Sequence, residues 1–210
     1  MPLIAVYGAS GFGREVMPLV KAEANEQNSK FIFVDDAKAN GTSILSFDEF
    51  VQYPEPEKQI VIAIASSQVR EDLARKCGVS NVPVLSVKAN NAVVLDDVMI
   101  GEGSILCSFT HLTSNVKIGR HFHANIYSYV AHDCIIGDYV TFAPGVKCNG
   151  NVHIDDHAYI GTGAILRQGS PDKPLHIGSG AVVGMGAVVT KDVGAGQTVI
   201  GNPARPMQAR

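Results

Sequence analysis

The chain has 210 residues, of which 46% are hydrophobic and 18% charged, with a formal net charge of −3. This composition predicts one or two packed domains and excludes a disordered chain, and the lack of basic excess argues against nucleic acid as a partner. The longest aliphatic run, residues 60–65, is too short to cross a bilayer, so we expect no membrane partner and a cytoplasmic protein. Four widely spaced cysteines without a C-x-x-C pair predict reduced, mostly buried thiols.

Residues 1–87 alternate short apolar runs with helix-like segments. We expect strands at residues 3–7, 31–34, 59–65 and 82–85, and helices after the first strand to about residue 24, near 47–51 and over 67–76. Strands that are apolar throughout and separated by helices are typical of a parallel sheet covered on both faces. The pattern predicts an α/β, Rossmann-like nucleotide-binding domain over 1–87. Pro18 predicts that the first helix starts late or kinks.

A glycine cluster, Gly8, Gly11 and Gly13, follows the first predicted strand. The start of a helix at this place attracts anions such as phosphate. The spacing is G-x-x-G-x-G and not the dinucleotide fingerprint G-x-G-x-x-G, so NAD is not implied. Asp35 and Asp36 follow the second strand, where carboxylates can bind a ribose or a base. A tight turn with two solvated acids is the alternative, but the combination favours a nucleotide site.

From residue 92 the sequence has a period of six. Thirteen hexads run from residue 92 to 169, and five more run from 175 to 204, with residues 170–174 as an interruption. A helix would repeat at 3.6 and a plain strand at 2, so neither explains this period. Three hexads of one strand and one corner each make an 18-residue triangular coil, and eighteen hexads make six coils of a parallel β-helix. The count also predicts that Ala195 and Gly201 occupy the third position of the last two hexads, as Ile177, Val183 and Val189 do in theirs.

The same register places His132 and Gly150 in neighbouring coils. They are 18 residues apart and both lie at the fifth hexad position, near a corner. Asp133, beside His132, can fix the imidazole tautomer and raise its basicity. Gly150 leaves its N–H accessible to a carbonyl oxygen. A base and an N–H donor one strand apart suit acyl transfer, although a solvated turn histidine beside a turn glycine is the simpler alternative.

Several segments together resemble the hexapeptide-repeat acyltransferases: the interrupted hexad array, residues 128–137 and 145–151, and the ending Gly-Asn-Pro-Ala-Arg at 201–205. With the glycine cluster and the Asp35–Asp36 pair, the whole chain is similar to the subfamily that acetylates nucleotide-linked amino sugars in bacterial glycan synthesis, grouped with sialic-acid O-acetyltransferases. The resemblance implies an acetyl-CoA-dependent N-acetyltransferase acting on a nucleotide-linked sugar, of the 4-amino-4,6-dideoxy type. It also implies a left-handed β-helix over 88–210 that binds acetyl-CoA and assembles as a homotrimer.

The resemblance further implies roles for individual residues. His132 would deprotonate the attacking amine, Asp133 would orient it, and Gly150 would bind the thioester carbonyl. The nucleotide sugar would be held by Gly8, Ser10, Gly11, Gly13, Asp35, Asp36, Ala65 and Asn125. Acetyl-CoA, between neighbouring prisms, would contact Gly161, Thr162, Gly184, Met185, Asn202, Pro203 and Arg205, although the last three could equally be an end-cap.

The chain departs from members of this family at three positions. Asp133 stands where many have Glu, Thr141 where some have a second histidine, and Ala65 begins a segment where some have Gly-Asn-Asn. The alternatives are sugar O-acetylation, a zinc carbonic-anhydrase-like protein and an inactive scaffold or nucleotide sensor. We expect no metal, because His153 and His157 are four residues apart on a repeat of six and cannot stack.

Overall fold

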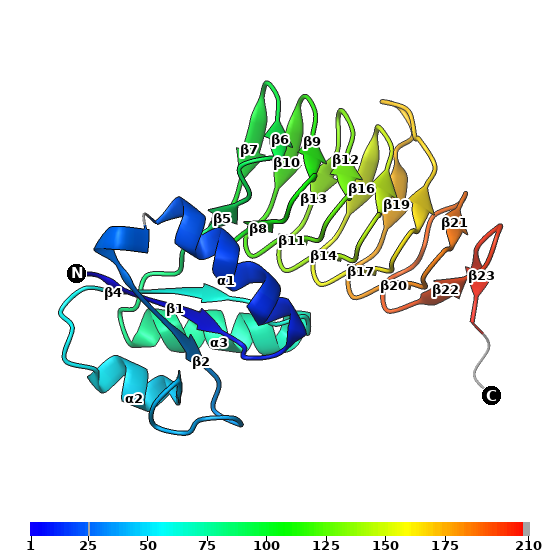
Figure 1. The fold of residues 1–210 in the computed structure, drawn as a ribbon. Helices are drawn as coiled ribbons and strands as arrows, with labels where there is room; N and C mark the ends of the chain where they lie inside the picture. The colour runs from blue at the N-terminus through cyan, green and yellow to red at the C-terminus, as the bar shows by residue number, and fades with distance from the viewer. Residues whose placement is uncertain (25, 208–210) are drawn as a thin grey trace. The chain divides into compact units, whose positions relative to one another are not determined.

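The computed structural model describes residues 1–24 and 26–207, and the chain divides into two units, Met1–Lys88 and Ala89–Arg210. Figure 1 shows helices around a small sheet in the first unit and stacked coils in the second. The strands of the first sheet are parallel and follow the spatial order β3 (Ile44–Leu45), β2 (Lys30–Val34), β1 (Leu3–Tyr7) and β4 (Lys58–Ile62). The remaining elements of this unit are α1 (Gly11–Glu23), the 3₁₀ turn η1 (Glu26–Asn28), α2 (Phe47–Gln52), α3 (Ser67–Val79) and β5 (Val87–Lys88).

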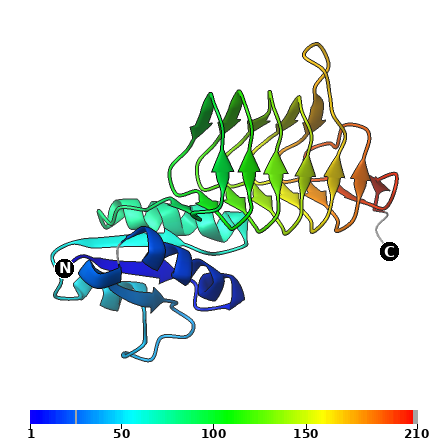
Figure 2. The ribbon, with the colours of Figure 1, turned by 45° about the horizontal axis from the view of Figure 1, so that its top comes forward.

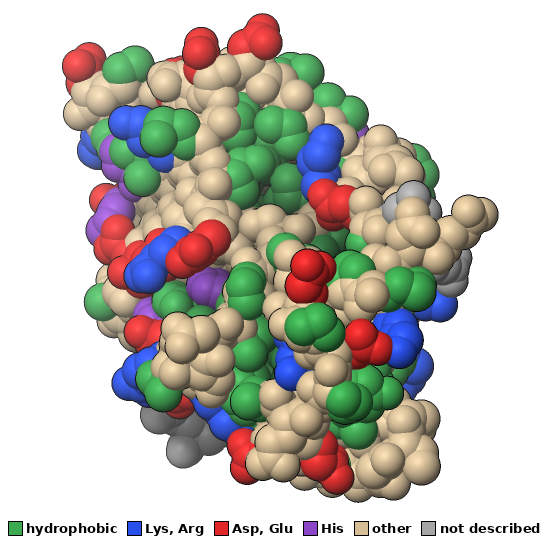
Figure 3. Space-filling view, turned by 90° about the vertical axis from the view of Figure 1, so that its left-hand side faces the viewer, with side chains coloured by type: hydrophobic (Ala, Val, Ile, Leu, Met, Phe, Trp, Pro, Cys, Tyr) green, Lys and Arg blue, Asp and Glu red, His purple; other side chains and the backbone are tan. Residues whose placement is uncertain are grey.

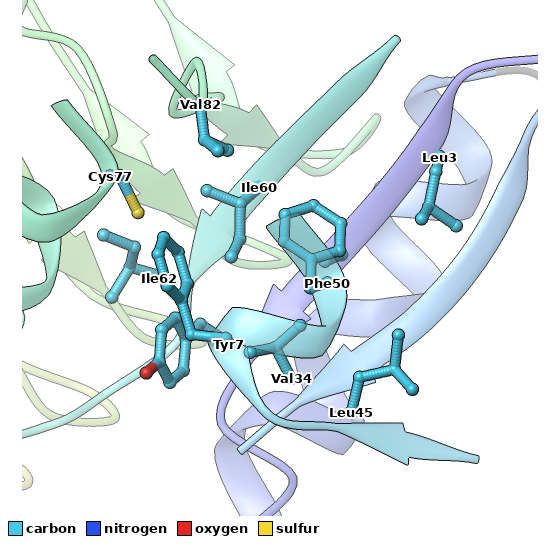
Figure 4. Packing of buried hydrophobic residues seen from close by; sticks show 11 residues of the cluster. Leu3, Tyr7, Val34, Leu45, Phe50, Ile60, Ile62, Cys77 and Val82 are labelled. Carbon is cyan, nitrogen blue, oxygen red and sulfur yellow. The ribbon is translucent and has the colours of Figure 1, made fainter. Parts of the chain in front are cut away.

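Both faces of this sheet are covered, as its apolar strands predict, and every residue of β1 is buried. One face carries a cluster that α2 and α3 close with Phe47, Phe50 and Cys77, and Figure 4 shows Phe50 and Cys77 among the side chains that gather over the strands. On the opposite face α1 packs against β1, and a Cβ on Gly13 would lie in ordinary van der Waals contact, 3.6 Å, with the Val6 side chain.

Four expectations for this unit need correction. Helix α1 starts at Gly11 and runs past Pro18, so it does not start late. β4 ends at Ile62, and α3 extends three residues beyond position 76. Residues 82–85 form no strand, because only Val84 bridges to Ile60 while Pro83 lacks an N–H for a ladder.

The second unit is a parallel β-helix with three sheets, and Figure 2 shows strands of successive coils side by side. The first sheet contains β7 (Val98–Ile100), β10 (Val116–Ile118), β13 (Ile135–Ile136), β16 (Val152–Ile154) and β19 (Leu175–Ile177). The second contains β8 (Ile105–Leu106), β11 (His123–Ala124), β14 (Thr141–Phe142), β17 (Tyr159–Ile160), β20 (Val182–Val183) and β22 (Thr198–Ile200), with β23 (Arg205–Pro206) antiparallel to β22. The third contains β6 (Val93–Val94), β9 (His111–Leu112), β12 (Tyr129–Val130), β15 (Lys147–Cys148), β18 (Ile165–Leu166) and β21 (Val188–Val189).

The register confirms the 18-residue coil through most of the array. Ile118 pairs with Ile136, and Ile136 with Ile154, each one coil apart. After residues 170–174 loop out, Ile154 pairs with Ile177, which restores the stack. Interior positions are filled by buried aliphatic and aromatic side chains, as the hexad pattern predicts.

The prediction for the last coil is wrong. Ile177 bridges to Val193 and Val183 pairs with Val199, a spacing of 16 residues. Val193 and Val199 are 2% and 4% exposed, whereas Ala195 and Gly201 lie at the surface. The coil is two residues shorter because burying two valines gains more than burying an alanine and a glycine.

Each coil turns at three corners, and at most of these corners one residue has a left-handed backbone. We call the corner between the third and first sheets the first corner; its left-handed residues are Asp97, Asn115, Asp133 and Asn151. The second corner joins the first and second sheets, and its left-handed residues include Gly103, His121, Tyr139 and His157. The third corner joins the second and third sheets, with Phe109, Tyr127, Gly145, Gly163 and Gly186.

The surface carries charges of both signs. On the face drawn in Figure 3, acidic and basic side chains are interspersed among hydrophobic ones. None of the helices within the described residues combines the length and the apolarity that a bilayer crossing demands.

Candidate active site

His132 and Asp133 form a hydrogen-bonded pair at the first corner, directly after β12. The distance from His132 Nδ1 to Asp133 Oδ2 is 2.7 Å, and the side chains are 50% and 44% exposed. Hydrogen bonds from His132 and from Asn115 Nδ2, the latter at 2.7 Å, lower the pKa of the Asp133 carboxyl. An ionised Asp133 holds the proton on Nδ1, which leaves the lone pair of the imidazole on Nε2.

Gly150 lies against the imidazole from the next coil. A Cβ on this residue would lie 2.5 Å from His132 Cε1 and 2.6 Å from Nε2, so a larger residue would displace the ring. Within the described residues, no group accepts a hydrogen bond from the Gly150 N–H. The structure therefore brings together the predicted base, the carboxylate and a free amide donor.

The peptide unit between Asn149 and Gly150 is held from two sides. The Cys134 thiol donates to the Asn149 carbonyl at 3.2 Å. The side-chain Oδ1 of Asn149 accepts from the Tyr129 hydroxyl at 2.9 Å, and its Nδ2 donates to the Leu166 carbonyl at 2.7 Å. These contacts fix the direction of the Gly150 N–H. Neither Asn149 nor Tyr129 is among the residues predicted from the sequence, although the 18-residue register places them on neighbouring coils.

The glycine cluster closes the carboxyl end of β1. Gly8 has φ 115°, and a Cβ there would lie 2.8 Å from the Ala63 carbonyl oxygen. A Cβ on Gly13 would lie 1.7 Å from the Gly8 oxygen, so these two glycines are required by packing. Gly11 has open space around its Cα, and Ser10 is exposed and makes no side-chain capping bond to α1. In this segment, a ligand can therefore approach Ser10 and Gly11.

Asp35 ties the second strand to the glycine cluster. Its Oδ2 accepts from the Ala9 N–H at 3.0 Å and its Oδ1 from the Ala37 N–H at 3.2 Å. Asp36 serves the fold more directly, since its Oδ1 accepts from the Phe47 N–H at 2.7 Å at the start of α2. One oxygen of Asp36 is therefore already bonded within the protein. Asp36 is not a solvated loop acid, which was the alternative to a nucleotide site.

Tyr7 and Lys76 also contact Asp36. The Tyr7 hydroxyl donates to its Oδ2, and Lys76 Nζ lies 3.4 Å from the same oxygen. Burial acts to raise the pKa of the Asp36 carboxyl, but hydrogen bonds from Phe47 and Tyr7 outweigh it and lower the pKa. Asp36 stays ionised, and its charge is shared among three donors.

Ala65 is exposed in the turn after β4, and the buried Arg70 holds this turn. Arg70 donates to the Ile64 and Ala65 carbonyls at 2.7 and 3.2 Å. The guanidinium is fully buried, so the carboxyl end of β4 is built on a cation that the sequence analysis did not single out.

The residues predicted to bind acetyl-CoA gather at the third corner, apart from Gly150. A Cβ on Gly161 would lie 2.6 Å from the Met185 N, and the Gly186 N–H donates to the Thr162 carbonyl at 2.8 Å. The chain ending reaches the same region, because the Ala204 N–H donates to the Val188 carbonyl. The remaining members of this group are Gly184, Asn202, Pro203 and Arg205.

Asn125 does not lie beside His132. It precedes β12, whereas His132 follows it, and its Nδ2 donates to the Phe142 carbonyl at 2.8 Å. The other histidines are dispersed: His121 and His157 each stack on Tyr139 at the second corner, and His153 pairs with His176 in the first sheet. Across residues 1–24 and 26–207, no three His, Cys, Asp or Glu side chains come together as metal ligands would.

Comparison with protein families adds two matches. Residues 3–77 match the PglD N-terminal domain, and residues 115–150 match the bacterial transferase hexapeptide, six repeats. The second match contains His132, Asp133 and Gly150, together with Asn115.

Three relatives cover nearly the whole chain. A GDP-perosamine N-acetyltransferase from Escherichia coli O157:H7 is 48% identical over 99% of this chain and 97% of its own. The solved structure of WeeI from Acinetobacter baumannii AYE is 60% identical with a TM-score of 0.95, covering 99% of this chain and 100% of that one. The acetyltransferase domain of PglB from Neisseria gonorrhoeae FA1090, in complex with acetyl coenzyme A, is 28% identical with a TM-score of 0.85, covering 98% of each chain.

Proposed function

Because the chain belongs to the hexapeptide-repeat N-acetyltransferases that act on nucleotide-linked amino sugars, we propose that His132 is the general base of its reaction. The chain is an acyltransferase, and acetyl-CoA is its cosubstrate. The observation that carries the assignment is the His132–Asp133 hydrogen bond at 2.7 Å beside the unpaired Gly150 amide.

The reaction begins with the loss of a proton from the sugar amine. An ammonium has no lone pair for attack, and Nε2 of His132 is placed to accept its proton while Asp133 stabilises the resulting imidazolium. The amine nitrogen then bonds to the thioester carbonyl carbon, and the negative charge moves to the carbonyl oxygen. When this intermediate collapses, the carbon–sulfur bond breaks, the CoA thiolate takes the proton from His132, and the positively charged nitrogen releases its extra proton to water, which leaves the neutral amide. The imidazole is then ready for another turnover.

Gly150 supplies the donor for the developing oxyanion. Gly150 lies against the imidazole, and the contacts of Asn149 fix its peptide in place before the substrate arrives. A preorganised donor of this kind stabilises a tetrahedral intermediate more than a mobile one, because no free energy is spent on reorienting it.

The first unit is proposed to be Rossmann-like and to hold the nucleotide, with residues 1–87 as the nucleotide-sugar domain and 88–210 as the catalytic domain. In the order β3-β2-β1-β4, the chain reverses direction across the sheet between β1 and β4, where open α/β sheets bind ligands. Gly8, Ser10, Gly11, Gly13, Asp35, Asp36 and Ala65 all lie at or beyond carboxyl ends of these strands. Asn125 is a weaker candidate, because its amide nitrogen already bonds to the Phe142 carbonyl.

The third corner and the chain ending are proposed to bind CoA, and the protein is proposed to act as a homotrimer. Thr162 and Met185 are exposed there, and Arg205 offers a cation for CoA phosphates. His132 is half exposed in one chain, so a neighbouring copy is needed to shield the reaction from water. Light scattering at assay concentration should give three times the chain mass, and a fully active monomer would contradict the trimer. A cytoplasmic location is proposed as well, as expected from the sequence.

The proposed substrate is GDP-perosamine, a 4-amino-4,6-dideoxy sugar nucleotide, because the relative from E. coli O157:H7 bears that activity in its name. Release of the CoA thiol should be measured with GDP-perosamine and with a UDP-linked 4-amino-4,6-dideoxy sugar. A higher kcat/KM for the GDP sugar is expected. Preference for the UDP sugar would reject guanine as the nucleotide base of the substrate and would leave the proposed acetyl transfer intact.

A further inference from the structure

Asn115 lies one coil from Asp133 at the first corner and contacts its carboxylate. Its Nδ2 donates to Asp133 Oδ1 at 2.7 Å, while Asp133 Oδ2 bonds to His132 Nδ1 at the same distance. The two carboxylate oxygens thus have different partners, and the three side chains form a single row from Asn115 to the imidazole.

We propose that Asn115 is a positioning residue for the acetyl transfer, acting on His132 through the Asp133 carboxylate. The inference rests on the proposed function, since it assigns Asn115 to the same base. A carboxylate held at one oxygen only can rotate about its last side-chain bond. The amide of Asn115 fixes the second oxygen, so the first stays in line with the imidazole.

Exposure makes this support necessary. His132 and Asp133 are 50% and 44% exposed, and Asn115 is exposed too, so no packing from the chain itself locks the carboxylate. In water the Asp133 side chain would otherwise exchange between rotamers, and the imidazole would lose its orientation for part of the time. A surface base therefore depends on hydrogen bonds for its placement.

The backbone explains why asparagine suits this position. Asn115 has φ 54° and Asp133 has φ 59°, and asparagine and aspartate tolerate the left-handed conformation better than most residues. Backbone demand alone would be met by glycine or by aspartate. Neither of these can donate to Asp133, so glycine and aspartate substitutions separate the backbone role from the hydrogen bond.

The test compares kcat, both KM values and the pH profile of kcat/KM for Asn115→Gly and Asn115→Asp. Asn115→Gly keeps the left-handed turn and should lower kcat about tenfold, with both KM values unchanged, because the base is misplaced for part of the time. Asn115→Asp adds a negative charge beside the pair, which favours the imidazolium. The midpoint of its profile should therefore move to higher pH. The titratable groups that interact with the Asp133 carboxylate, within the described residues, are His132 and the Cys134 thiol.

A double-mutant cycle shows whether Asn115 acts through Asp133. Asp133→Gly also keeps the left-handed turn, and adding Asn115→Gly to it should cause no further fall in kcat. Asp97→Gly is the matched control, since Asp97 is the left-handed residue of the first corner one coil before Asn115, and it should behave as wild type. Thermal unfolding of each variant checks that the coil is intact.

Three outcomes separate the proposal that Asn115 positions the base from the proposal that His132 is the base. Loss of kcat in Asn115→Gly, absent in the Asp133→Gly background, supports the inference. Wild-type kcat and pH midpoint in both Asn115 variants, with His132→Ala inactive, would overturn it and leave the proposed base in place. Near-normal kcat in His132→Ala would remove the base and the positioning role together.

Discussion

The first and second corners of the β-helix share one backbone geometry and differ in what their side chains do. At the second corner the Arg120 N–H and guanidinium bond to Asp138, and the Asp138 N–H bonds to Asp156. His121, Tyr139 and His157 stack there with ring centroids 5.0 and 5.2 Å apart. The second corner uses its polar groups to join coils.

At the first corner the polar groups point outward and remain accessible. Asn115 and His132 each bond to one oxygen of Asp133, and the Gly150 amide stays available. The comparison teaches that a repeat backbone does not itself make a site. The site arises where side chains satisfy each other at the surface and leave one nitrogen and one N–H for a substrate.

Replacing His132 should have the largest effect. His132→Ala should lower kcat by roughly 10²–10⁴, the usual range for a lost general base, with both KM values nearly unchanged. The rise of kcat/KM with pH in the wild type should disappear in the variant. His157→Ala, at the second corner, is the control and should keep its kcat. Normal turnover by His132→Ala would mean that the proton leaves by another route.

Gly150→Ala should come next. The added methyl would lie 2.5 Å from His132 Cε1, so the imidazole must move away from its place. A displacement of about 1 Å at a reacting group can cost on the order of 10² in rate, and we expect a kcat fall of that size. Gly180→Ala, at the second corner, where nothing lies within 4 Å of the added atom, controls for the loss of a glycine in the same unit, although its φ of 64° also brings strain. Wild-type kcat in Gly150→Ala would show that the ring need not stay there.

Asp138→Ala tests the second corner and should act on stability alone. Removing an acceptor of several hydrogen bonds should lower the free energy of unfolding by about 1–3 kcal/mol, with kcat unchanged at 25 °C. Burial acts to raise the pKa of the Asp138 carboxyl, but hydrogen bonds from Arg120 outweigh it and lower the pKa.

The sign of this shift gives a pH dependence. A carboxyl whose pKa is lower in the folded state contributes its full stability above its ordinary pKa of about 4, and loses it as the pH falls through the folded value. Denaturant unfolding between pH 2 and 6 should therefore show a smaller acid-side loss in Asp138→Ala than in the wild type. Identical slopes would assign the acid sensitivity to other carboxyls.

Arg205→Ala extends the comparison to the third corner and should have the smallest effect. If the guanidinium meets a CoA phosphate, its loss should raise the KM for acetyl-CoA about threefold to tenfold, up to about 1.4 kcal/mol, with kcat and the sugar-nucleotide KM unchanged. Lys191→Ala, another exposed cation of the same unit, is the control. A variant with an unaltered acetyl-CoA KM would leave the chain ending as an end-cap.

The sequence predicted the coils well because an interior position tolerates few residue types. Ile118, Ile136 and Ile154 are buried in register as the hexads require. The last coil escaped prediction because hexad counting treats all small or apolar residues alike, whereas burial favours Val193 and Val199 over residues two positions later. A sequence repeat predicts the register correctly unless a shifted register buries larger apolar side chains.

The sequence predicts where the site lies. It does not predict which side chains hold the site residues in place. The spacing of 18 puts Gly150 against His132 and also puts Asn115 beside Asp133, yet an asparagine at a corner is explained by the turn alone. Arg70 was beyond prediction, because its partners are backbone carbonyls whose positions depend on the folded loop. The same holds for Asp36, whose bond to the Phe47 N–H depends on where α2 begins.

The positive φ at the corners also restricts which residue types can occupy these positions. Within the described part of the β-helix, nine non-glycine residues at the corners adopt positive φ, and six of them are Asn, Asp or His. These residue types are enriched in that conformation for steric reasons, and they are also the types that exchange protons or orient a base. A stack of such turns therefore displays potential acid–base groups at regular intervals along its edges before any selection for catalysis. New activities in this architecture can begin from residues that the backbone already favours.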